Sequence, residues 1–187
     1  MSYKRWLFVA IFLFLIGFGS GLISGLATPG GIASLFSEDI AALEEFAGLL
    51  VSLPKLSVFL FILIKNTSAV LISFALSPIF CLAPVVALIL NGGLLGFVST
   101  LVIQEKSLGY LLAGLIPHGI FELPALIIGE AVALRFGTAV LLAVVKRERR
   151  SHLLSYLRQS LRYLLIALTL FLLAAIIETY ITPLLLR

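Results

Sequence analysis

The chain has 187 residues, of which 61% are hydrophobic and 12% charged, and its mean hydropathy is +1.22. Soluble proteins carry about 25% charged residues, so the composition excludes a soluble protein and indicates a polytopic membrane protein. Several apolar runs approach the roughly 20 residues that a helix needs to cross a bilayer, which predicts an all-α membrane helix bundle. The net charge is +4, and most of the basic residues lie next to the ends of these runs. Their position indicates membrane topology rather than nucleic-acid binding.

The first apolar run extends from Trp6 to about Leu26 and follows Lys4 and Arg5. It is longer than the core of a signal peptide, which has about 7–15 residues, so we interpret it as an uncleaved span with a cytoplasmic amino terminus. Small residues on one stripe of this run would let another backbone approach closely, either within the bundle or in a homodimer. The stripe consists of Gly17, Gly21 and Gly25.

The segment 28–54 is acidic. Ser37 is placed as the N-cap of a helix, and Glu38 and Asp39 follow it in the first turn. The helix dipole stabilises negative charge at that position. Apolar residues then recur at spacings of three and four. We predict an extracytoplasmic amphipathic helix, docked on the bundle or on a partner protein.

Polar residues interrupt the next apolar run, 56–76, at Lys65, Asn66 and Thr67. Either the span begins near Asn66 and Lys65 lies at the interface, or Lys65 lies within the membrane and needs a carboxylate partner. A charge at the bilayer centre costs about 2.5–3.5 kcal/mol even on the most permissive scales. The long side chain of lysine readily extends its charged group to the membrane–water interface, which favours the first alternative.

The span predicted over 85–103 carries an amide, Asn91, and further small residues, Gly92 and Gly96. We predict close helix packing at the glycines and an interhelical hydrogen bond from Asn91, with a ligand role as the alternative. The single cysteine, Cys81, has no partner for a disulfide and no metal-ligand spacing, so we interpret it as a small buried apolar residue.

The region 108–145 contains two prolines seven residues apart, Pro117 and Pro124, with Gly119 between them. Each proline lacks a backbone donor and clashes with the preceding turn. We therefore predict a helix broken at Pro117–Pro124, so that the region makes one crossing from a half-helix and a longer helix. Two tightly paired spans are the alternative.

Between the prolines, His118 and Glu122 stand four apart and share one helix face. An ionisable residue inside a membrane is a functional candidate, and its partners come from neighbouring helices. The predicted polar cluster comprises His118, Glu122, Asn91, Asn66, Lys65 and Glu130. A structural lock, an ion or proton site and a partner-binding site are the open interpretations.

The segment 146–162 is strongly basic and adjoins an apolar run, which predicts a cytoplasmic amphipathic helix over lipid headgroups. The last span runs from Tyr163 to about Ile181. The prediction is thus one transmembrane domain, 1–187, with about five crossings of the cell membrane and an outside carboxyl terminus.

Four features resemble the stage II sporulation protein M family: Lys65-Asn66-Thr67 preceding one span, Pro84 with Asn91-Gly92 in the next, the small size, and the motif from Pro117 to Ala125. The resemblance covers residues 5–185. It implies a multi-span membrane anchor, since members in spore-forming bacteria are thought to hold two peptidoglycan-degrading proteins at the engulfing membrane.

We therefore expect a non-catalytic scaffold in the lipid bilayer that recruits membrane or extracytoplasmic proteins, and that is able to form homo-oligomers. No catalytic motif, metal site, cofactor or nucleic-acid partner is predicted, because the chain lacks a nucleophile elbow, a two-histidine metal spacing and a phosphate loop. The alternative is a small-ion or proton transporter that uses His118 and Glu122, as transporters place broken helices around a site.

Overall fold

The structure is a computed structural model that describes residues 2–27 and 53–185. Its elements are α1 (Tyr3–Ala27), α4 (Lys55–Leu76), α5 (Leu82–Glu105), α6 (Leu108–Val145), the 3-10 helix η1 (Arg147–His152), α7 (Leu153–Tyr180) and α8 (Thr182–Leu185). No strand occurs in these two ranges, and five helices are long and apolar enough to cross a membrane. The predicted all-α membrane bundle is confirmed. The predicted acidic helix of 28–54 lies almost wholly outside the described residues.

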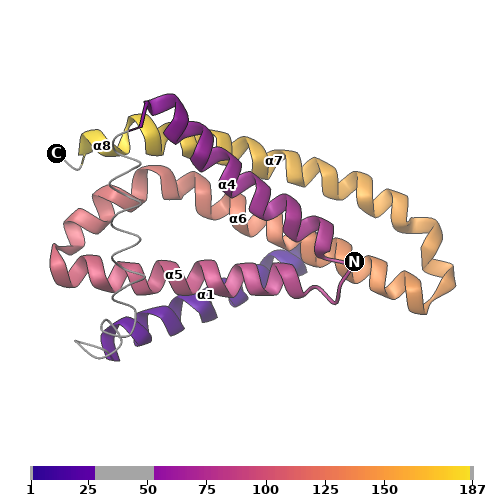
Figure 1. The fold of residues 1–187 in the computed structure, drawn as a ribbon. Coiled ribbons are helices and arrows are strands. Elements are labelled where there is room, and N and C mark those ends of the chain that lie inside the picture. Colours follow the sequence, from indigo (N-terminus) through magenta and orange to yellow (C-terminus); the bar gives the residue numbers. More distant parts are fainter. Residues whose placement is uncertain (1, 28–52, 186–187) are drawn as a thin grey trace.

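The long helices alternate in direction along the bundle (Figure 1). The amino terminus and η1 lie towards one end, and the carboxyl-terminal α8 lies at the other. Large apolar side chains on the outside are well exposed, among them Phe8 at 70%, Phe12 at 64% and Leu90 at 64%. A surface of this kind needs hydrocarbon around it, so the chain is a multi-pass protein of a lipid bilayer.

Helix α6 is the centre of the bundle. Residues 129–135 are seven consecutive buried positions, which means that neighbours surround the helix on every side. Along its length α6 contacts each of the other described helices. Any polar side chain on α6 must therefore find its partners on those neighbours.

The prediction of a broken helix at Pro117–Pro124 is wrong in one respect, because α6 is a single helix of 38 residues that contains both prolines. Each proline removes only one hydrogen bond, and neighbouring helices make such residues tolerable within a bundle. The helix changes direction along its course instead of ending (Figure 1). Gly119 is buried within it. The region is thus one helix rather than two paired spans.

The predicted amphipathic helix over 146–162 is also different in the structure. Its first part is η1, and its second part is the beginning of α7, which continues without interruption to Tyr180. No proline or glycine occurs between 153 and 180, so nothing in the sequence ends the helix before it becomes the last span.

Glycines hold α1 and α5 in backbone contact. A Cβ added to Gly21 would overlap the carbonyl oxygen of Gly93, and one added to Gly17 would overlap that of Ile89. From the opposite side, Gly92 and Gly96 meet backbone atoms of α1 in the same way, and Gly25 meets Thr100. The predicted glycine stripes therefore pack against each other within the bundle.

The glycine contacts make a stability prediction. We expect Gly21→Ala to destabilise the protein by about 1–3 kcal/mol, because the added methyl must push two backbones apart. The measurement is thermal unfolding in detergent, followed by loss of the monodisperse peak.

Gly19→Ala is the matched control on the same helix, since a Cβ there meets no atom of the described residues within 4 Å. It should leave the stability unchanged or raise it slightly. Equal losses in the two variants would contradict the proposed backbone contact.

Candidate functional site

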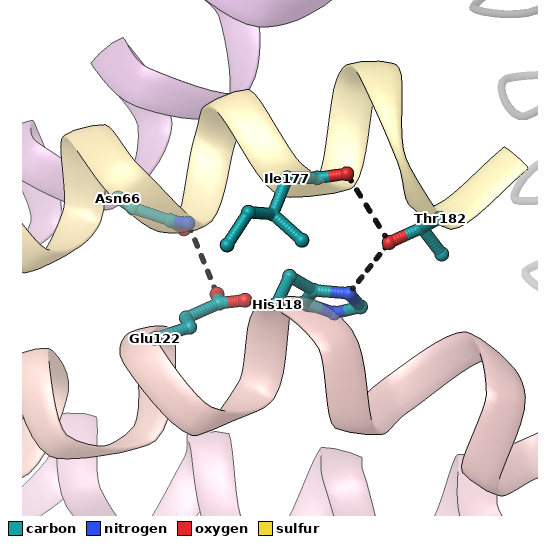
Figure 2. Close-up of polar contacts among 5 residues, drawn as sticks. All are labelled: Asn66, His118, Glu122, Ile177 and Thr182. Carbon is teal, nitrogen blue, oxygen red and sulfur yellow. Dashed lines mark hydrogen bonds and ion pairs between the residues drawn. The ribbon is translucent and has the colours of Figure 1, made fainter.

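A group of polar side chains lies where α4, α6 and the end of α7 meet (Figure 2). His118 and Glu122 project from consecutive turns of α6, with 3.9 Å between His118 Nε2 and Glu122 Oε2. Asn66 of α4 donates a hydrogen bond of 3.0 Å from Nδ2 to Glu122 Oε1. The structure thus brings together three of the predicted residues, although 56 positions separate Asn66 from Glu122 in the chain.

The surroundings of His118 define where its ring carries a proton. Its Nδ1 lies 3.4 Å from Thr182 Oγ1, and the same hydroxyl lies 3.4 Å from the carbonyl oxygen of Ile177 (Figure 2). A carbonyl only accepts, so the hydroxyl donates its hydrogen to Ile177 and accepts one from the His118 Nδ1–H. A neutral imidazole in this arrangement has its lone pair on Nε2, the nitrogen that faces Glu122.

Glu178, two residues before the end of α7 at Tyr180, completes the group. One ligand atom from each of His118, Glu122 and Glu178 lies within 4.8 Å of the other two. We call these three residues and Asn66 the His–Glu cluster. Lys65 is exposed in the middle of α4, and its positive charge interacts electrostatically with the carboxylate of Glu178. This fits the alternative in which Lys65 faces a carboxylate.

The charges of the His–Glu cluster are poorly balanced. Two carboxylates within 4.8 Å repel by about 3.5 kcal/mol at an effective dielectric constant of about 20. The side chains of His118 and Glu122 are 14% and 29% exposed, so water screens them only partly. An arrangement of this kind favours binding a cation or sharing a proton between the two carboxylates.

Glu130 is not part of the His–Glu cluster. It is fully buried, and one of its carboxylate oxygens accepts a hydrogen bond from Ser73 of α4 while the other has no partner in the part of the chain that the structure describes. Eight residues, or about 12 Å of helix, separate it from Glu122. Between them Val70 packs directly on Gly129, where a Cβ would come within 2.5 Å of the valine Cγ1. An apolar layer therefore divides the two carboxylates.

Asn91 also lies apart from the His–Glu cluster. It is exposed and donates its hydrogen bond to the carbonyl of Ala87 in its own helix. Within residues 2–27 and 53–185, the predicted interhelical hydrogen bond from Asn91 is therefore absent. The reason is that α5 turns Gly92 and Gly96 towards α1, and the residue before Gly92 then points outward.

Three polar residues of this core were missed by the sequence prediction. Glu178 and Thr182 complete the surroundings of His118, and Arg135 of α6 is 3% exposed and donates to Gln159 of α7. Glu178 and Arg135 each interrupt an apolar run, so the rule that picked out Glu122 applied to them equally. Their partners, however, depend on the tertiary arrangement.

The fold and the polar core define an integral membrane bundle whose central helix carries its ionisable groups. The chain matches the model of the family described as stage II sporulation protein M over residues 10–183. It therefore belongs to the stage II sporulation protein M family. It is 26% identical over 176 residues to an uncharacterized protein of Methanocaldococcus jannaschii. The matched region covers 94% of each of the two chains. No solved structure matches it.

The hydrogen bond of Asn66 gives a second stability prediction. Asn66→Ala leaves Glu122 Oε1 without its donor in a partly buried site, so we expect a loss of about 1–3 kcal/mol. Asn91→Ala is the matched control, because that exposed amide bonds only to its own helix. Unfolding in mixed micelles measures both changes, and a similar loss for Asn91→Ala would contradict a specific role of Asn66.

Proposed function

We propose that the protein is a non-catalytic scaffold of the cell membrane that recruits partner proteins through its basic end. The observation that carries this proposal is the hairpin formed by the end of α6, η1 and the start of α7, which extends beyond the connection between α4 and α5 (Figure 1). A rigid helical projection is a means of holding another protein at a defined place.

The surface of this hairpin is strongly basic. Its exposed cationic residues are Lys146, Arg147, Arg149, Arg150, Arg158 and Arg162, and Glu148 is the single acidic residue of 146–162. Charge of this sign next to a membrane end supports a cytoplasmic position, with the amino terminus on the same side. It also favours an acidic protein surface as the partner, whose approach positive charge would steer.

The opposite end offers a second contact in this proposal. The acidic segment 28–52 connects α1 to α4, and both of these helix ends lie away from the basic hairpin (Figure 1). With the amino terminus inside, this segment and the carboxyl terminus are extracytoplasmic. A protein with different charges on its two ends suits an anchor that engages one partner on each side of the membrane.

Charge reversal tests the basic surface. We expect Arg158→Glu with Arg162→Glu to cause a several-fold loss of cross-linked partner proteins in native membranes, quantified by mass spectrometry. Both side chains are exposed, so the fold should persist.

Lys106→Glu is the control, since Lys106 is an exposed cation in the connection at the other end of the bundle. The proposal fails if the cross-linked proteins are the same in the wild type and the doubly reversed variant.

A second candidate function is transport of a small ion or a proton, and the His–Glu cluster favours it because ionisable groups of this kind form transport sites. The apolar layer of Val70 and Gly129 argues against it, as it separates this cluster from Glu130 and from the basic end. We therefore place the scaffold first.

Ion flux distinguishes the two functions. In the scaffold proposal, proteoliposomes should lose a pH or cation gradient no faster than empty liposomes, and Glu122→Gln should change nothing. Faster decay that Glu122→Gln abolishes, in a variant that remains folded in detergent, would establish transport instead.

A further inference from the structure

The His–Glu cluster has the composition and spacing of a metal centre. His118 supplies an imidazole nitrogen, and Glu122 and Glu178 each supply a carboxylate oxygen, with the three atoms within 4.8 Å of one another. Two ligands of a tetrahedral zinc ion lie about 3.4 Å apart at bond lengths of about 2.1 Å. The separation of 3.9 Å between His118 Nε2 and Glu122 Oε2 is close to that value and too long for a hydrogen bond.

The orientation of the imidazole also suits a metal. In the neutral imidazole the hydrogen lies on Nδ1 and is used on Thr182, so the lone pair of Nε2 faces the carboxylate of Glu122. Two lone pairs that face each other repel unless a metal ion or a proton lies between them. A metal-bound histidine generally donates its other N–H to a neighbouring acceptor, which is the role that Thr182 has here.

The carboxylate ligand is supported in the same way. Asn66 donates to Glu122 Oε1, the oxygen not paired with His118, and so holds Oε2 towards Nε2 (Figure 2). Ligating carboxylates are typically hydrogen-bonded by such outer residues. The cluster thus has both a set of ligands and a set of residues that orient them, drawn from α4, α6, α7 and α8.

We infer that His118, Glu122 and Glu178 bind one divalent transition-metal ion, with zinc as the preferred ion. One imidazole and two carboxylates, without a thiolate, select zinc over calcium and magnesium, which prefer oxygen ligands alone. Three protein ligands leave a position for water, and the partial exposure of His118 and Glu122 gives the ion access. The bound ion joins α6 to the end of α7. This inference does not depend on the scaffold proposal.

Zinc binding to the full chain in nanodiscs tests the inference. After the protein has been treated with a chelator, isothermal titration with zinc chloride should show one ion per chain. Glu178→Gln and His118→Ala should each weaken this binding by about 100-fold or more, and Asn66→Ala by about 10–100-fold. Calcium and magnesium should not compete.

The chain offers a matched control in its second histidine. His152 is exposed at the far end of the bundle, in η1, so His152→Ala should bind zinc as the wild type does. Equal binding by His118→Ala and the wild type, a loss on His152→Ala alone, or competition by calcium would overturn the inference.

X-ray absorption of the zinc-loaded wild type provides a test that needs no variant to fold. It should show one imidazole together with oxygen ligands around the ion. A shell of oxygen alone, a sulfur ligand, or the absence of stoichiometric zinc would refute the site, whatever the outcome of the cross-linking and flux experiments.

Discussion

The bundle depends on one constraint: α6 carries ionisable side chains through its centre, and a low-dielectric interior requires a partner for each of them. These partners come from different helices. Asn66 and Ser73 of α4 bond to Glu122 and Glu130, and Gln159 of α7 bonds to Arg135. Each such contact fixes the register of a helix against α6, because a slip of one turn would leave a buried charge without its hydrogen bond. The polar contacts therefore specify the arrangement as well as stabilising it.

Helices α1 and α5 are joined by a different kind of contact. Gly17 and Gly21 of α1 meet backbone atoms of α5, and Gly92 and Gly96 of α5 meet backbone atoms of α1, so association here relies on dispersion over a close approach. The same contact explains the exposure of Asn91, since a helix that turns one face inward must turn the next residue outward. Close packing at glycines therefore holds one side of the bundle together, and polar contacts hold the other side together.

The sequence predicted the spans well, because twenty apolar residues in a row have few other uses. It also predicted that His118 and Glu122 share a face, since a spacing of four is a local property of a helix. The break at Pro117–Pro124 was wrong because each proline removes only one hydrogen bond, and α6 packs against neighbouring helices along its length. Glu178 was missed as a partner of His118 because only the tertiary fold brings the end of α7 to the first half of α6.

The His–Glu cluster contains both a pair with local helix spacing, His118 and Glu122, and a partner that only the tertiary fold brings to it, Glu178. A helix lock made only of hydrogen bonds would use donors opposite each acceptor, as Ser73 does for Glu130. Here two carboxylates face a nitrogen lone pair, and Lys65 acts on Glu178 from an exposed position. The negative charge of this corner is thus only partly balanced. A bound metal ion would balance it while keeping α6 and α7 together at this end of the bundle.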